Sequence, residues 1–142
     1  MSSALHAFLH PVTFQEEKDF VVSTRFRDED GKVHPFRIRA LTQEENERAV
    51  ALSTHVVLKD GAAVEKLDSK EYSSRLMLAA TLEPNFAATE LCQCYGTMDP
   101  VEVPARMLLA GEYARLSAEI MRISAFDDTP AGEKAIEEAV KN

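Results

Sequence analysis

The sequence predicts a fold of the α+β class, mainly α, in which an N-terminal β-hairpin is followed by a bundle of five to six short helices. Over residues 20–40, apolar and polar side chains alternate with a period of two, which is typical of strands with one buried face. Over residues 43–124, apolar side chains recur at helical spacing, and glycine and proline divide this region into short segments. The densest apolar run, residues 91–123, is expected to form the packing centre of the bundle.

Length and charge restrict the class of protein. A chain of 142 residues fits one globular domain that needs no disulfide or metal to hold its core. The formal net charge of −8 argues against nucleic acid and membrane surfaces as partners, because both carry negative charge. No apolar run approaches the roughly 20 residues that span a bilayer, and residues 1–11 lack the basic start of a secretory signal. We therefore expect the protein to remain in the cytoplasm in which it is made.

The expected domain organisation has three parts. Residues 1–19 are expected to form an N-terminal arm, because a short helical apolar pattern is followed by a polar, acidic linker over residues 13–19. Residues 20–126 are expected to form the single globular domain. Residues 127–142 are expected to form a weakly anchored tail helix, because they carry few large apolar side chains.

The hairpin over residues 20–40 is expected to turn at residues 29–31. A three-residue loop that ends with a left-handed Gly31 keeps the apolar side chains of both strands on one face, whereas a two-residue turn would not. Pro35 cannot donate a hydrogen bond to a neighbouring strand, so the second strand is expected to have a free edge there.

The opposite face of this hairpin is expected to gather four arginines, Arg25, Arg27, Arg37 and Arg39. A cationic face on an acidic chain is a candidate surface for a partner. Alternating outward charges also keep a half-exposed sheet in solution. We favour this simpler interpretation, and the first stays open beside it.

After the hairpin, Thr42 and Glu45 form a capping-box signature and predict a helix that runs to about residue 56. The stretch 58–68 then breaks the helical pattern, and Asp60-Gly61 marks a turn within it. We expect this stretch to be the longest loop of the domain.

The next helix is expected to begin at Asp68, which starts a second capping signature, and to end before Pro84. A further helix is expected from about residue 88 to Gly96, because glycine suits the left-handed position after a last helical turn.

Two prolines shape the segment that follows. Pro100 suits the first position of a helix, but Pro104 would strain a helix that continued through it. We expect a tight turn over residues 100–103, a short helix over residues 104–109, and the longest helix of the domain over residues 112–124.

No residue pattern predicts catalysis, a metal site or a cofactor. Cys92 and Cys94 stand one residue apart on an expected helix, which is wrong for a disulfide and too few ligands for structural zinc. The four histidines are scattered, and neither a phosphate-binding loop nor a nucleophile elbow occurs. We therefore do not expect an enzyme.

Four segments carry a family resemblance, in this order along the chain: FVVSTRFRDEDGKVHPFRIRALTQEENE, YSSRLMLAATLEPNF, ELCQCYGTMDPVEV and MLLAGEYARL. Over about residues 1–127 the chain resembles the XkdN-like tail assembly chaperones of contractile-tailed phages and prophages. It departs from the pattern at Pro104, where such proteins generally continue a helix, and over residues 59–67, which are short and divergent.

The resemblance implies an assembly factor of the host cytoplasm. Proteins of this family are thought to bind the tape measure protein, a very long and largely helical chain, to keep it soluble, and to help tail tube subunits polymerise around it without staying in the virion. The tail tube protein and a second copy of the chain are further candidate partners. The family's genes are often read in two frames, and we interpret this chain as the short form, with Lys141 and Asn142 encoded near the slip site.

Grooves between short helices could accept amphipathic segments of such a partner, with methionines as an adaptable lining. Filling of the core is the plainer role for these methionines. Together with the arginines above, the candidate partner-binding residues are Tyr95, Met98, Met107 and Tyr113. Two alternative functions stay open, namely a structural tail component of the virion and a DNA-binding regulator that uses the arginine face.

Overall fold

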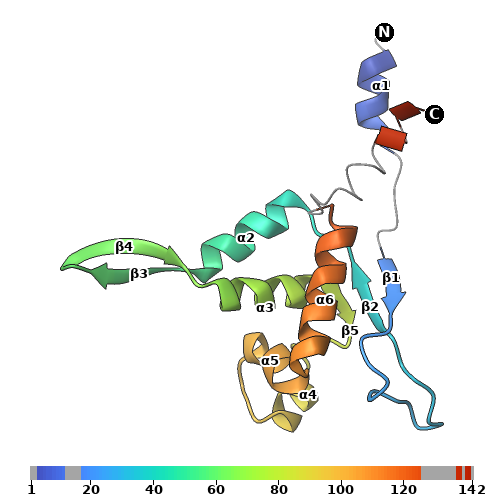
Figure 1. Cartoon of the computed structure of the whole chain (residues 1–142), viewed down its shortest axis with the longest axis vertical. Helices are drawn as coiled ribbons and strands as arrows, with labels where there is room; N and C mark the ends of the chain where they lie inside the picture. The colour runs from blue at the N-terminus through green and yellow to red at the C-terminus, as the bar shows by residue number, and fades with distance from the viewer. Residues whose placement is uncertain (1–2, 12–16, 126–136, 139, 142) are drawn as a thin grey trace.

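The computed structural model in Figure 1 describes residues 3–11, 17–125, 137–138 and 140–141. Its main helices are α1 (Ser3–Leu9), α2 (Gln43–Ser53), α3 (Ser69–Ala80), α4 (Thr89–Cys94), α5 (Val103–Met107) and α6 (Ala110–Ile123), with a 3-10 turn, η1 (Pro100–Glu102), before α5. Its strands are β1 (Glu17–Phe20), β2 (Phe36–Arg39), β3 (Thr54–Lys59), β4 (Ala62–Leu67) and β5 (Thr81–Glu83).

The strands form two separate antiparallel sheets. One has three strands in the order β1-β2-β5, and the other is the hairpin of β3 and β4. Strands and helices therefore alternate along the chain, and the expected fold, an N-terminal hairpin followed by a helix bundle, is wrong. The difference arises because β5 follows α3 directly and pairs with β2, so that a segment read as the end of a helix becomes a sheet edge.

The first hairpin is also shorter than expected. Phe20 pairs with Phe36, and the next pair is Arg27 with Val33. Between these two pairs lie six residues on the first side of the hairpin, 21–26, and only two on the second, 34–35. Val22 lies in this excess segment and turns into the core with 3% of its surface exposed, which ends the strand pairing. Residues 17–19, expected in the linker, belong to β1.

Of two predictions for that hairpin, the three-residue loop is confirmed and the free edge at Pro35 is wrong. The three-residue loop forms as predicted, since the Asp28 N–H donates to the Lys32 carbonyl at 2.8 Å and Gly31 has φ +81°. The free edge expected at Pro35 is absent from the second strand, because β2 is the central strand and Pro35 lies just before it.

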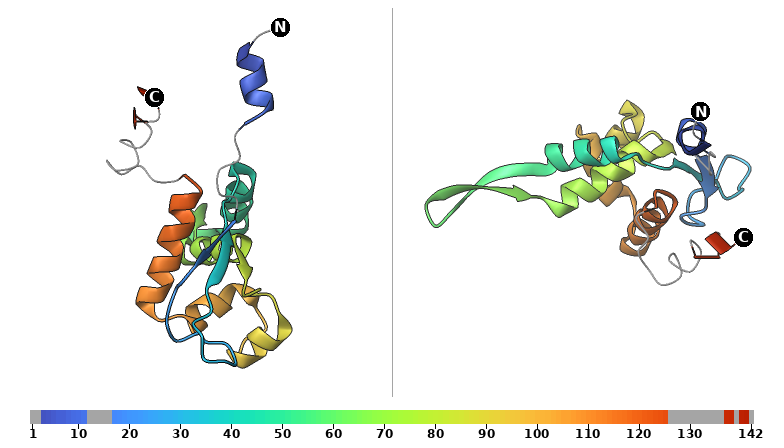
Figure 2. Two further views of the ribbon diagram at one scale, coloured as in Figure 1. Left: turned by 90° about the vertical axis from the view of Figure 1, so that its right-hand side faces the viewer. Right: turned by 90° about the horizontal axis from the view of Figure 1, so that it is seen from above.

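The hairpin of β3 and β4, which we call the ribbon, replaces the loop that was expected over residues 58–68. Six consecutive residue pairs connect its strands, from Thr54–Leu67 to Lys59–Ala62. The turn lies at Asp60 and Gly61, as predicted, and both have positive φ. Figures 1 and 2 show the ribbon extending beyond α2 and α3, away from the rest of the molecule.

The helix starts predicted at Thr42 and Asp68 are confirmed by their capping bonds, but the first of these helices ends at Ser53 and not near residue 56. Thr42 and Glu45 form the capping box of α2, and the Asp68 carboxylate accepts hydrogen bonds from the first turn of α3. The longest described helix is α6, and Pro104 stands in the first turn of α5 rather than inside a longer helix. The tail helix expected after residue 126 lies mostly outside the described residues.

The core lies between the inner face of the three-stranded sheet and helices α3, α5 and α6. Phe36 and Ile38 point into it from β2, where Ile38 has no exposed surface. The helices contribute further fully buried side chains, among them Met77, Val103, Leu116 and Ile120. Within the described residues, no helix is long and apolar enough to cross a membrane.

Candidate partner-binding surfaces

The predicted arginine face is divided among several ion pairs. Arg37 and Arg39 do lie on the outer side of β2, opposite the buried Phe36 and Ile38. Arg37 donates to the Glu17 carboxylate on β1 at 3.0 Å, and this pair is about half exposed. The positive charge of Arg37 is thus partly balanced on the sheet itself.

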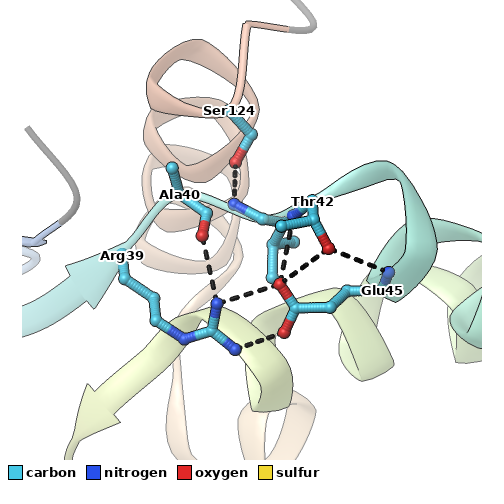
Figure 3. Close-up of polar contacts among 6 residues, drawn as sticks. Arg39, Ala40, Thr42, Glu45 and Ser124 are labelled. Carbon is cyan, nitrogen blue, oxygen red and sulfur yellow. Dashed lines mark hydrogen bonds and ion pairs between the residues drawn. The ribbon is translucent and has the colours of Figure 1, made fainter. Parts of the chain in front are cut away.

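Arg39 belongs to a network that joins β2 to the start of α2 (Figure 3). Its Nη1 donates to Glu45 Oε1 at 3.0 Å and to the Ala40 carbonyl at 3.1 Å, and its Nη2 pairs with the other oxygen of Glu45. Glu45 Oε1 also accepts from the Thr42 N–H at 3.0 Å. The Arg39 guanidinium, with help from the Thr42 amide and hydroxyl, lowers the pKa of Glu45 to about 2 although partial burial opposes the shift.

One residue further along, the same corner is tied to α6. The Leu41 N–H donates to the Ser124 hydroxyl oxygen at 2.9 Å, immediately after the end of that helix (Figure 3). Arg39 and its neighbours therefore hold three elements together, and they serve the fold first.

Arg25 is placed in a turn and reaches α6 rather than the sheet face. Its Nε donates to Glu112 Oε2 at 2.9 Å, and its Nη2 donates to the Met107 carbonyl at 3.3 Å. Glu112 also accepts from the Leu109 N–H at 2.9 Å. Hydrogen bonding from Arg25 is the largest of the effects that lower the pKa of Glu112 to about 2.

Arg27 stabilises the loop in which it stands. Its guanidinium donates to the carbonyls of Thr24 at 3.0 Å and Gly31 at 2.9 Å. The four arginines thus do not form one continuous cationic face, and their role in binding a partner stays a prediction.

The other four candidate partner-binding residues lie in different environments. Met98 is 99% exposed, whereas Met107 is buried in the core. Tyr95 and Tyr113 are half-buried, and the Tyr113 hydroxyl lies 2.9 Å from the Ser74 hydroxyl on α3. The burial of Met107 favours the core role for it, and Tyr113 is the candidate that borders a groove.

The ribbon carries the apolar surface that sequence reasoning missed. Leu58 is 80% exposed and Val56 is 68% exposed, and both lie on one face of the ribbon with Leu67. Val57 and Val64 form a cross-strand pair on the opposite face. The sequence did contain a signal for a hairpin, because Asp-Gly is a preferred two-residue hairpin turn and valines stand on both sides of it, at Val56, Val57 and Val64.

Three hollows follow one another from the ribbon onto the helices, and together we call them the trough. The first lies on the ribbon, has a volume of about 660 Å³ and is lined by Val57, Leu58, Lys59, Val64, Glu65 and Lys66. The second, about 430 Å³, is lined by His55, Val57, Lys66, Leu67, Asp68, Ser69 and Lys70. The third, about 560 Å³, lies between α3, α5 and α6 and is lined by Ser69, Lys70, Ser73, Ser74, Ala105, Leu108, Ala110 and Tyr113.

The hollows of the trough adjoin one another, because each shares lining residues with the next. The first and second share Val57 and Lys66, and the second and third share Ser69 and Lys70. It thus runs from the ribbon to Tyr113, the one predicted contact residue that lines it.

Metal chemistry finds no support in the part of the chain that the structure describes. No group of three or more His, Cys, Asp or Glu side chains there could hold an ion. Cys92 is buried and Cys94 is exposed, and both are free thiols.

Comparison with known proteins places the chain in a family. A family model described as "Phage XkdN-like tail assembly chaperone protein" matches residues 5–140. The uncharacterized protein YqbN of Bacillus subtilis is 39% identical over 129 residues, which cover 89% of this chain and 85% of YqbN. The phage-like element PBSX protein XkdN of the same organism is 34% identical over 129 residues, with the same shares covered.

A solved structure agrees with these matches. The crystal structure of the protein YqbN is similar with a TM-score of 0.70 and 34% sequence identity, and the match covers 85% of this chain and 96% of that one. The chain belongs to the family of XkdN-like phage tail assembly chaperones.

Proposed function

We propose that this protein binds the tape measure protein of a phage tail, keeps it soluble in the host cytoplasm while the tail tube assembles around it, and is absent from the mature virion. Membership of the tail assembly chaperone family supports a partner from the phage tail. The tape measure protein suits that role, because a very long helical chain exposes apolar surface until the tube encloses it.

The observation that carries this proposal is the uncovered apolar surface of the ribbon. Val56 and Leu58 on one face and Val57 and Val64 on the other are between 37% and 80% exposed. A two-stranded hairpin is at best marginally stable in water on its own, and exposed apolar patches mark sites of association. A partner that covers this surface would stabilise the ribbon as well as itself.

The charge of the chain supports the same role. A net charge of −8 on 142 residues opposes self-aggregation and keeps a complex with an apolar client dispersed. Beyond the tape measure protein, the tail tube protein is a further candidate partner, and self-association through the ribbon is a further candidate state.

Co-expression with the tape measure protein encoded beside this chain tests the proposal. The expected result is a soluble complex of the two proteins that survives affinity purification and size-exclusion chromatography. A tape measure protein that stays insoluble and unassociated in the presence of this chain would contradict it. Adding the tail tube protein to the same culture tests that second partner.

Mass spectrometry of purified phage particles separates the chaperone from its alternative. We expect no copies of this chain in mature tails. Abundant copies there would favour a structural tail component of the virion instead.

A further inference from the structure

We infer that the trough binds a helix of the partner that carries acidic side chains beside an apolar face. This inference rests on the proposed function, since it names the kind of tape measure segment that is held. Its occupant is a partner helix and not a second copy of this chain.

Both ends of the trough offer apolar contacts. On the ribbon, the Val57–Val64 pair forms its floor, with 37% and 38% of each residue exposed. On the helices, the half-buried Tyr113 lines its other end, beside the buried Leu108. A partner must therefore present apolar side chains along its length and not at one point.

The trough is lined by cations that have no ion-pair partner in the part of the chain that the structure describes. Lys59, Lys66 and Lys70 line it, and none of them makes an ion pair with any residue that the structure describes. The arginines on the sheet are engaged in the contacts described above, whereas these three lysines are available. On a chain of net charge −8, such a group of cations favours a partner with carboxylates in matching positions.

Carboxylates lie beside the trough, but none of those described makes an ion pair with its lysines. Glu71 lies 3.0 Å from the ring of His55, which lines the second hollow, and so is paired with that side chain. Asp68 accepts hydrogen bonds from the Lys70 and Glu71 N–H groups at 3.1 Å and so is used to start α3. Glu65 borders the first hollow, but it pairs with Val56, so its side chain leaves the strand on the face opposite the Val57–Val64 pair. The face that holds the Val57–Val64 pair therefore carries Lys59 and Lys66 without a facing acid from either strand.

The geometry favours a helix over an extended peptide. The ribbon offers side chains on its faces and unpaired backbone groups only along its outer edges, so a segment lying on a face must satisfy its own backbone hydrogen bonds. A helix does this within itself. Strand addition to an edge of the ribbon is the competing arrangement.

The length and spacing of the partner helix follow from the same geometry. Six strand residues cover about 20 Å, and the first turns of α3 add about 9 Å, so the trough fits a helix of about 20 residues. The ribbon and α3 extend in one direction in Figure 1 and in the right-hand view of Figure 2. Lys59 and Lys66 are four residue pairs apart, about 13 Å, which matches carboxylates about seven or eight residues apart on one face of the partner helix.

Charge reversal in the full-length chain tests the inference. The variant K59E/K66E/K70E is co-expressed with the tape measure protein beside a matched control, K32E/R48E/K141E, which changes the net charge equally at exposed positions away from the trough. We expect the trough variant to hold the tape measure protein at least about tenfold more weakly, and the control to bind like the wild type.

Two further variants make the test specific. Replacement of the same lysines by glutamine should weaken binding to an intermediate degree, because it removes attraction without adding repulsion. V57T/V64T keeps β-branched side chains in the ribbon and should also weaken binding, whereas V56T, on the other face, should not. Overlapping synthetic peptides of the tape measure protein, probed with the intact chain, should bind where acids flank an apolar helical face.

The outcomes separate the inference from the proposed function. A wild-type chain that holds no tape measure protein contradicts the proposed function. If the wild type binds the tape measure protein and both the trough variant and V57T/V64T bind it equally well, the trough is not the binding site and the proposed function is unaffected. A complex that V56T disrupts as strongly as V57T/V64T overturns the assignment of the partner helix to the Val57–Val64 face. A dimer of the isolated chain that K59E/K66E/K70E abolishes, with tape measure binding intact, assigns the trough to a second copy.

Discussion

Replacement of Glu45 by glutamine should make the free energy of unfolding less dependent on pH, because Glu45 is the charged partner of Arg39. Glu45 has a pKa of about 2 instead of the ordinary 4.5. One pKa unit corresponds to about 1.36 kcal/mol, so this fall sets an upper bound of about 3.4 kcal/mol. The two side chains are 22% and 30% exposed, and solvent screening reduces the expected loss in E45Q at pH 7 to about 1–2 kcal/mol.

The direction of the pH effect follows from linkage. The pKa of Glu45 is lower in the folded state than in the unfolded state, so its contribution is complete above about pH 4.5 and disappears as the pH falls towards 2. The wild type and E45Q should therefore differ most near neutral pH and converge near pH 2. Other carboxylates, such as Glu112, affect both proteins equally and cancel in this difference.

Urea unfolding at a series of pH values between 7 and 2 measures the difference directly. The control is E44Q, since Glu44 is also acidic, lies in the same first turn of α2 and is exposed. We expect E44Q to lower the free energy of unfolding by less than about 0.5 kcal/mol. A constant gap between the wild type and E45Q down to pH 2, or an equal loss in E44Q, would refute the argument that the ion pair is responsible.

Three other predictions follow from burial, backbone conformation and exposure. I38A should lower the free energy of unfolding by about 2–5 kcal/mol, because Ile38 has no exposed surface. V56A on the ribbon should lower it by less than about 1 kcal/mol. Equal losses of the two variants in urea unfolding would contradict the division between core and ribbon. G31A should cost about 1 kcal/mol, because φ is +81° there and no atom crowds a new Cβ, and thermal unfolding should detect a loss of that size and not a larger one. In hydrogen exchange, amides of the ribbon should exchange faster than those of β2 and become protected when the tape measure protein binds; slow exchange in the free protein would argue against an uncovered ribbon.

The elements that sequence reasoning predicted correctly are set by local chemistry. The capping residues Thr42 and Asp68 mark helix starts because each accepts hydrogen bonds from amides within three residues. Gly31 and Gly61 mark turns because each adopts a positive φ that suits glycine. Such signals can be read from a few neighbouring residues, whatever the rest of the chain does.

The ribbon was missed because its strands lack the usual pattern. A strand is recognised by apolar and polar residues that alternate between a buried and an exposed face. Every residue of β4 is exposed, and β3 is exposed beyond Thr54, so neither strand needs that alternation. The Asp60-Gly61 turn was identified, but without alternation on either side it indicated only a loop.

The remaining differences depend on contacts between distant parts of the chain. Thr81 pairs with Ile38, so β5 exists only because β2 is already placed beside it. Arg25 bonds to Glu112, 87 residues later in the sequence, and this removes it from the predicted face. Neither contact can be predicted from neighbouring residues, because Ile38 and Glu112 lie far along the chain from Thr81 and Arg25. The alternation of the arginines therefore predicted one cationic face, whereas in the structure Arg25 contacts α6.

The ribbon can evolve for binding with little cost to the fold. None of its residues belongs to the buried core cluster, which the inner face of the sheet and the helices complete among themselves. Under the proposed function, the client must also be released when the tube closes around it. Half-exposed valines and solvent-screened lysines would suit that release, because each contact is weak alone and many are required together. A competing tube subunit would then displace the client stepwise. A deep, dry pocket would hold the client more firmly and hinder its transfer.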